Sequence, residues 1–139
     1  METVTVHWHG PYRLDTMHQY TVSDSFGVYT ISSIYRGKER LVYIGKTERP
    51  FSTRIKEHQA WIQLVHGEIR VRLGLLSMED GRRYSSRKLS DVEALLITYY
   101  SPEENTVNST WYYGRPELAI INTGRKGLLE SRVSTEQLE

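Results

Sequence analysis

The sequence predicts a single α+β domain in which a small central antiparallel β-sheet is flanked by helices. Runs rich in alternating, β-branched and aromatic residues, typical of strands, occur at residues 3–8, 26–35, 41–44 and 69–75. Apolar residues at helical spacing follow positions 50 and 90. A length of 139 residues suits one domain and leaves no room for a second domain of ordinary size.

Composition narrows the class of protein. The absence of cysteine removes disulfides and thiolate metal sites and fits a reducing compartment. No apolar run approaches the length of a membrane span, and the first ten residues lack the layout of a signal peptide. We therefore expect an intracellular, cytoplasmic protein with no membrane partner. A net charge of +1 does not by itself indicate a tight nucleic-acid binder.

The first element is expected to be a strand over residues 3–8, ended by a turn at residues 9–12. His7 and His9 would share one face of this strand, a spacing that can bind a metal, but no third ligand is near in the sequence. Residues 1–25 are therefore interpreted as an N-terminal extension that lengthens the sheet or covers one of its edges.

The central feature is a β-hairpin followed by a helix. Residues 26–35 and 41–44 are the two strands, joined by a charged turn over 36–40 that contains a glycine. A helix is expected from residue 51 to Gly67, with a buried stripe formed by Phe51, Ile55, Ile62 and Val65. Arg54 and His58 are four residues apart and so lie side by side on a neighbouring face.

The second half is expected to contain a strand over residues 69–75 with outward arginines, and then a polar, mobile loop over 78–88. Ser90 and Glu93 have the S-x-x-E form of a capping box, which starts a helix that Pro102 ends. A short apolar run covers 118–121, and a polar end that frays begins at about Ser131. We divide the chain into a core over 26–122 and a tail over 123–139.

The two strands of the hairpin carry the short motifs Gly27-Val28-Tyr29 and Tyr43-Ile44-Gly45. These motifs resemble the signature of the GIY-YIG nucleases, a metal-dependent family of DNA-cleaving domains, with Val in place of Ile in the first motif. The two tyrosines are 43 − 29 = 14 residues apart, slightly more than is usual in the family. Further matches follow in the family's order: Lys46, Arg54, His58, Glu93, Pro102 and Asn105.

The resemblance implies a role for each polar position. Tyr29 is the general base or relays the proton, and Tyr43 hydrogen-bonds the phosphate or the attacking water. Arg54 offers a planar fork to the phosphate, and either Lys46 or the metal favours the phenolate of Tyr29. Further roles fall to three residues: His58 orients the nucleophile or binds the scissile phosphate, Asn105 supports the site, and Glu93 is the one protein carboxylate on Mg²⁺ or Mn²⁺.

Each of these residues also has an ordinary interpretation. A strand tyrosine usually packs its ring, Glu93 serves as a capping-box partner, and Arg54 is a helix-surface cation. Asn105 is a turn residue after the proline, with Asn108 and Asn122 as rivals for its place. The conjunction of these positions, in one order, favours the interpretation as a site.

Basic residues gather between positions 68 and 88, where six cations face three acidic residues. They form either a patch that binds DNA phosphates or a solvated surface. The six are Arg70, Arg72, Arg82, Arg83, Arg87 and Lys88. Two functions follow: a metal-dependent endonuclease that hydrolyses phosphodiester bonds in DNA, or a catalytically inactive GIY-YIG-like module that binds DNA or a protein.

Overall fold

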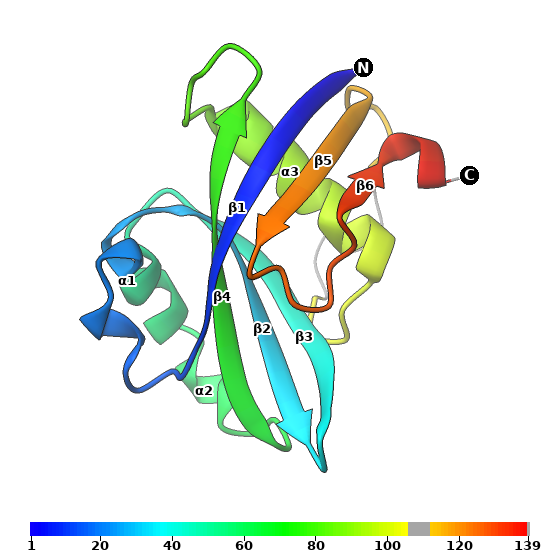
Figure 1. Cartoon of the computed structure of the whole chain (residues 1–139). Helices are drawn as coiled ribbons and strands as arrows, with labels where there is room; N and C mark the ends of the chain where they lie inside the picture. The colour runs from blue at the N-terminus through cyan, green and yellow to red at the C-terminus, as the bar shows by residue number, and fades with distance from the viewer. Residues whose placement is uncertain (106–111, 139) are drawn as a thin grey trace.

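The computed structural model describes residues 1–105 and 112–138 and consists of one six-stranded sheet with helices on both faces (Figure 1). The sheet order is β3-β2-β4-β1-β5-β6. The strands are β1 (Glu2–Tyr12), β2 (Gly27–Tyr35), β3 (Lys38–Thr47), β4 (Glu68–Met78), β5 (Leu118–Gly124) and β6 (Arg132–Ser134). The α+β class is confirmed, but the sheet is mixed and not wholly antiparallel, because β1 and β5 run parallel.

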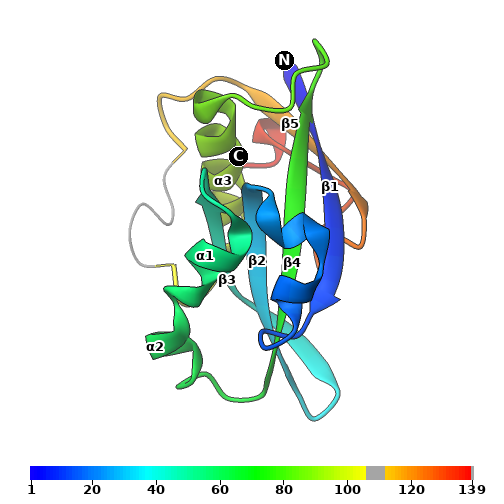
Figure 2. The same cartoon turned by 90° about the vertical axis from the view of Figure 1, so that its left-hand side faces the viewer.

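Three α-helices lie in the described part of the chain: α1 (Phe51–Lys56), α2 (Gln59–Ile62) and α3 (Ser86–Tyr100). Three short 3₁₀ turns accompany them: η1 (Met17–Gln19), η2 (Thr21–Asp24) and η3 (Thr135–Leu138). Figure 2 shows α1, α2, η1 and η2 in front of the sheet and α3 on the other side.

Successive residues of β2 therefore enter two different cores. Val28 packs with the apolar face of α3, whereas Tyr29 packs with Phe51 and Ile55 of α1. This is the ordinary consequence of side chains that alternate along a strand whose two faces are both covered. It places Tyr29 beneath the helices that carry Arg54 and His58.

The hairpin turn is tighter than the sequence led us to expect. Only Arg36 and Gly37 form it, with φ of 52° and 78°, and Lys38 already pairs with Tyr35. Two central residues at positive φ match the right-handed twist of the strands, so a two-residue turn suffices. β3 therefore begins at Lys38, and the prediction of a five-residue turn was wrong.

The predicted single helix after residue 50 is instead two short helices that break at Glu57 and His58. His58 has φ −89° and ψ 0°, outside the regular helical values. Its ring is buried and hydrogen-bonded, so tertiary contacts override the helical pattern. Phe51, Ile55 and Ile62 are buried as predicted, whereas Val65 is only half-buried.

α3 starts earlier than predicted. Ser85 is its N-cap, with Oγ accepting a hydrogen bond from the Lys88 N–H at 3.2 Å. Ser90 and Glu93 consequently lie inside the helix, and the capping-box interpretation was wrong. Residues 86–88, expected in a mobile loop, are its first turn. The helix ends at Tyr100, before Pro102 as predicted, and Ser101 is its C-cap with φ 45°.

Both ends of the chain belong to the sheet. β1 lies between β4 and β5, and the residues expected to form a turn after His9 continue it across an irregularity in its pairing with β4. β6 pairs with β5 and buries Val133, so the expectation that the chain frays from Ser131 was wrong for residues 131–138. Within the described residues, no helix combines the length and apolar character needed to cross a membrane.

Candidate active site at the edge of strand β3

The candidate site lies along the outer edge of β3, which pairs with no other strand within the residues that the structure describes. Residues that follow α3 cover this edge. Asn105 bridges this edge: its Oδ1 accepts from the Ile44 N–H at 2.9 Å, and its Nδ2 donates to the Ile44 carbonyl at 2.8 Å. The Glu104 N–H adds a bond of 3.1 Å to the Val42 carbonyl. Asn105 thus positions the backbone of the second motif and protects an edge strand.

The two rival asparagines do not share this position. Asn122 is buried, accepts from the Trp8 indole N–H at 2.8 Å and donates to the Glu130 carbonyl at 2.9 Å. Asn108 lies outside the described residues.

The glycine of the second motif makes room for the tyrosine of the first. Tyr29 pairs with Gly45 across the hairpin, and a Cβ on Gly45 would lie 2.5 Å from both Cζ and Oη of Tyr29. The Tyr29 ring therefore lies over Gly45, with 0% of its surface exposed. Gly27 is equally constrained, because its φ is +152° and a Cβ there would collide with the Gly74 carbonyl.

Tyr29, His58 and Trp61 form a short chain of hydrogen bonds. Tyr29 Oη lies 2.7 Å from His58 Nε2, and the Trp61 indole N–H donates to His58 Nδ1 at 3.0 Å. Indole can only donate, so His58 Nδ1 must be the unprotonated nitrogen. In the neutral ring the proton is then on Nε2, which donates to Tyr29. The tyrosine hydroxyl keeps its own proton for another acceptor.

Tyr43 completes an aromatic cluster on the solvent side of this chain. Its ring centroid is 4.9 Å from that of His58, 5.4 Å from that of Trp61 and 6.1 Å from that of Tyr29. Tyr43 is half-buried, whereas Tyr29 is fully buried. Of the two phenols, Tyr43 is therefore the one that solvent reaches.

Arg54 is fixed by an acidic residue one helical turn away. Its Nη1 donates to Glu57 Oε1 at 2.8 Å, and Arg49 donates to both oxygens of Glu57, each at 2.8 Å. These arginines lower the pKa of Glu57 to about 2, so it stays charged. The Arg54 guanidinium acts on both tyrosines and lowers their pKa values.

Burial governs the titration of the cluster. It raises the pKa of Tyr29 and of Tyr43, an effect that Glu93 reinforces and Arg54 opposes. Burial also lowers the pKa of His58 to about 4, with help from the Arg54 charge, so the imidazole is neutral at neutral pH. The nearest source of positive charge for a phenolate is therefore Arg54, and His58 supplies a neutral donor.

Glu93 reaches the same edge of β3 from α3. It is half-buried, and desolvation raises its pKa, while the ammonium and backbone N–H of Lys46 and the charges of Arg115 and Arg54 lower it. Ile44 and Lys46 are two residues apart on one strand, so their backbone groups point to the same side. Glu93 thus lies beside the edge that Asn105 covers further along.

A metal ion at this edge would have to be held chiefly by water and phosphate. Among the described residues, no group of three or more histidine, aspartate or glutamate side chains could hold a metal ion. Glu93 would be a single carboxylate ligand, the habit of Mg²⁺ at phosphate sites. The sequence suggested His7 and His9 as a possible pair of metal ligands. In the structure His7 Nδ1 lies 2.9 Å from Thr123 Oγ1.

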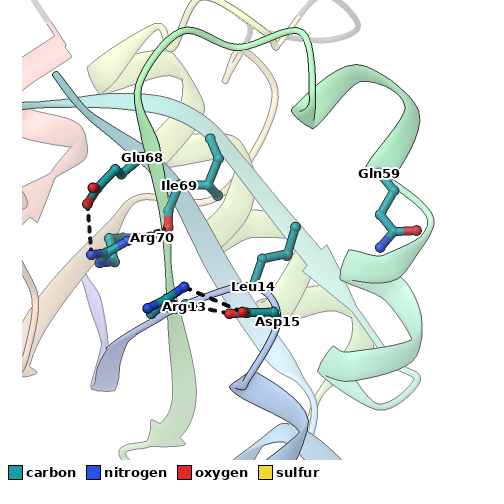
Figure 3. Close-up of a pocket in the computed structure, with 7 residues that line it drawn as sticks. All are labelled: Arg13, Leu14, Asp15, Gln59, Glu68, Ile69 and Arg70. Carbon is teal, nitrogen blue, oxygen red and sulfur yellow. Dashed lines mark hydrogen bonds and ion pairs between the residues drawn. The ribbon is translucent and has the colours of Figure 1, made fainter.

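The six basic residues between positions 70 and 88 do not form one patch. Arg70, Arg83 and Arg87 line three different pockets. Figure 3 shows Arg70 paired with Glu68 in the pocket that also contains Arg13 and Gln59. Arg82 pairs with Asp80, and Lys88 pairs with Glu2 and with Asp91.

Arg72 does not point outwards to solvent as predicted. It is 8% exposed and its Nη1 lies 2.5 Å from Glu39 Oε2, across β2 on strand β3. A Cβ at Gly127 would collide with its guanidinium, so the loop after β5 covers it. The alternating sequence of this strand predicted one buried face and outward arginines. That prediction was wrong for Arg72, because both faces of the sheet are covered.

Sequence reasoning missed the residues that hold the predicted ones in place. Trp61 and Glu57 are each three residues from a predicted site residue, His58 and Arg54 respectively, and this spacing was the available signal. Arg115, which acts on Glu93, had no such signal, because it comes from the segment before β5.

Comparisons with models of known families, with curated proteins and with solved structures give no match to this chain. A proposal about its function must therefore rest on the geometry of the site and on the resemblance of its motifs.

Proposed function

We propose that the protein is a metal-dependent endonuclease of the GIY-YIG type that hydrolyses phosphodiester bonds in DNA. The observation that carries the proposal is the convergence of Tyr29, Tyr43, Arg54 and His58 with Glu93 and Lys46 at one edge of the sheet. Phosphodiester hydrolysis requires a proton acceptor for the attacking water, a cation for the charge on the phosphate oxygens, and usually a metal. Candidates for all three gather at this edge.

The two tyrosines have different parts in the proton transfer. The half-buried Tyr43 would face the attacking water or the phosphate and, as a phenolate, take the proton of the water, whereas the buried Tyr29 donates a hydrogen bond to that phenolate. Tyr29 Oη accepts from His58 Nε2–H, and the Tyr29 hydroxyl in turn favours ionisation of Tyr43. A neutral His58 of this tautomer stabilises an oxyanion and does not take the proton itself.

Arg54 supplies the positive charge. It partly offsets the rise that burial causes in the pKa of both phenols and, at a face open to substrate, would neutralise the non-bridging oxygens of the phosphate. The ion pair with Glu57, itself clamped by Arg49, fixes the guanidinium before substrate binds. Such preorganisation removes the need to reorient the charge during the reaction.

Glu93 would hold Mg²⁺ or Mn²⁺, with Lys46 beside it. The metal would withdraw charge from the phosphate and lower the pKa of a bound water. Asn105 contributes by holding the backbone of Ile44, and with it the strand that carries both Tyr43 and Lys46.

A second candidate is a GIY-YIG-like module that binds DNA or a protein without cleaving. The burial of Tyr29 favours it, because this phenol has a raised pKa and no exposed surface. The two candidates make opposite forecasts for hydrolysis.

The test is incubation of supercoiled plasmid with the purified protein and Mg²⁺, or with EDTA. We expect nicked or linear plasmid when the protein is incubated with Mg²⁺, and intact plasmid when it is incubated with EDTA. Arg54→Ala should lower the rate on the order of 10²- to 10³-fold with an unchanged melt, as the loss of one charge-stabilising donor does. Arg36→Ala, at the exposed hairpin turn, is the matched control. Absence of product, or parent activity in Arg54→Ala, would favour the non-cleaving module.

A further inference from the structure

A pocket opens where the end of β3 meets the first turns of α3. It has a volume of about 500 Å³, within the range of ligand sites. Three segments far apart in sequence build it: the end of β3, the start of α3 and the residues that precede β5. Its lining residues are Lys46, Ser86, Arg87, Ser90, Asp91, Gly114, Arg115 and Pro116.

Cations outnumber carboxylates in the lining of the pocket. Glu48 lies beside it, where Ser86 and Lys46 act on its carboxylate. Lys46, Arg87 and Arg115 line the pocket itself, against the carboxylate of Asp91. That carboxylate is buried and already engaged, with Oδ1 2.9 Å from Arg115 Nη1 and Oδ2 3.6 Å from Lys88 Nζ. Arg87 is exposed and forms no ion pair within the described residues, whereas Lys46 acts on the carboxylates of Glu48 and Glu93. Arg87 is therefore the lining cation that remains for an anion.

The pocket adjoins the candidate active site. Lys46 belongs to both, and Lys46 and Arg115 both act on the charge of Glu93. Glu93 in turn acts on Tyr43, which also feels Arg54. Arg54 belongs to α1, on one face of the sheet, and the pocket lies at the start of α3, on the other face (Figure 2). A nucleic-acid strand presents phosphates at regular intervals to such an arrangement.

We propose that this pocket, through Lys46, Arg87 and Arg115 with the hydroxyls of Ser86 and Ser90, binds a backbone phosphate next to the scissile one on the same DNA strand. The inference rests on the proposed function and adds the place where the strand is held. Guanidinium forks and hydroxyl donors suit phosphate oxygens, and one such contact fixes the register of the strand without reading its sequence.

The test compares Arg87→Ala with Arg83→Ala. Both arginines are exposed: Arg83 precedes α3 and Arg87 lies in its first turn. Arg83 lines a different pocket, with Phe26 and Leu76. Binding of a fluorescent DNA duplex is measured in EDTA over a salt series. Loss of one phosphate contact should weaken binding several-fold and reduce the slope of log K against log salt by about 1. We expect this for Arg87→Ala only, and a larger loss for Arg87→Glu.

Four outcomes would overturn the inference. Equal effects of Arg87→Ala and Arg83→Ala would make Arg87 part of a diffuse basic surface. An unchanged slope in a variant that still cuts plasmid at the parent rate would reject the pocket and leave the nuclease proposal intact. If inorganic phosphate shifts the amide NMR signals of Ser86 and Arg87 while Arg87→Ala leaves DNA affinity unchanged, the pocket serves a free anion. A parent protein that neither binds nor cuts DNA rejects both proposals.

Discussion

At the scale of single residues, His58 is the centre of the site. Its position one turn after Arg54 was predictable from spacing, whereas its hydrogen bond with Tyr29 was found only in the structure. Its tautomer was not predictable, because that depends on the indole of Trp61, which packs there only after the helix breaks. The same holds for Glu57, whose role required knowing that Arg49 folds back from the preceding loop.

His58 makes stability depend on pH in a defined direction. Its pKa in the folded protein is about 4, below the ordinary 6.5, so the unfolded chain takes up the proton first as pH falls. The contribution of the neutral ring is complete above about pH 6.5 and is lost as pH falls toward 4. A shift of this size corresponds to about 3 kcal/mol.

Urea unfolding of the parent and of His58→Gln between pH 7.5 and 4 measures this effect. The free energy of unfolding of the parent should fall more steeply over that range, because Gln has no proton to bind. Parallel curves for the two proteins would show that His58 titrates normally.

At the scale of elements, the sequence predicted the types better than the boundaries. The hairpin, the strand that became β4 and the helix that became α3 were all predicted. The boundaries depended on contacts between elements: the twist match of Arg36 and Gly37, the burial of His58, and Ser85 in place of Ser90 as the cap of α3. These are packing effects that local pattern does not contain.

The hairpin offers a test of how the motif glycine works. Gly45→Ala should destabilise the protein by about 1–3 kcal/mol, since the new methyl group meets the buried Tyr29 ring. Gly81→Ala is the control, because nothing lies within 4 Å of its Cβ and its φ of +86° costs only backbone strain. Chemical denaturation compares them.

The effect on cleavage separates packing from strain. We expect Gly45→Ala to lose cleavage in proportion to the displacement of Tyr29, while Gly81→Ala keeps the parent rate. If the two variants lose equal stability and both cut DNA normally, the ring does not need the space above Gly45.

At the scale of the whole molecule, the arrangement of the sheet was beyond the reach of sequence. β1 occupies the middle of the sheet because it pairs antiparallel with β4 and parallel with β5, the latter more than a hundred residues later. The loop that follows β5 covers Arg72, which is why this arginine is buried and does not belong to an exposed basic patch. The arrangement of the sheet also brings α3, with Glu93, against the edge of the hairpin.

The position of Glu93 inside α3 makes one substitution decisive. Glu93→Gln keeps the shape of the side chain. Because residue 93 lies inside the helix and does not cap it, the melting temperature should stay almost unchanged. It removes the negative charge that a hard dication requires. Glu68→Gln, at the exposed start of β4, makes the same chemical change away from the site.

The most direct measurement is plasmid cleavage by the parent, Glu93→Gln and Glu68→Gln over a series of Mg²⁺ concentrations, with a thermal melt of each. We predict that cleavage by Glu93→Gln falls by about 100-fold or more, is little restored by added Mg²⁺ and leaves DNA binding in place, while Glu68→Gln behaves as the parent. Full cleavage by Glu93→Gln with a normal melt would contradict the assignment of Glu93 as the metal ligand and, with it, the account of this edge as a metal-dependent active site.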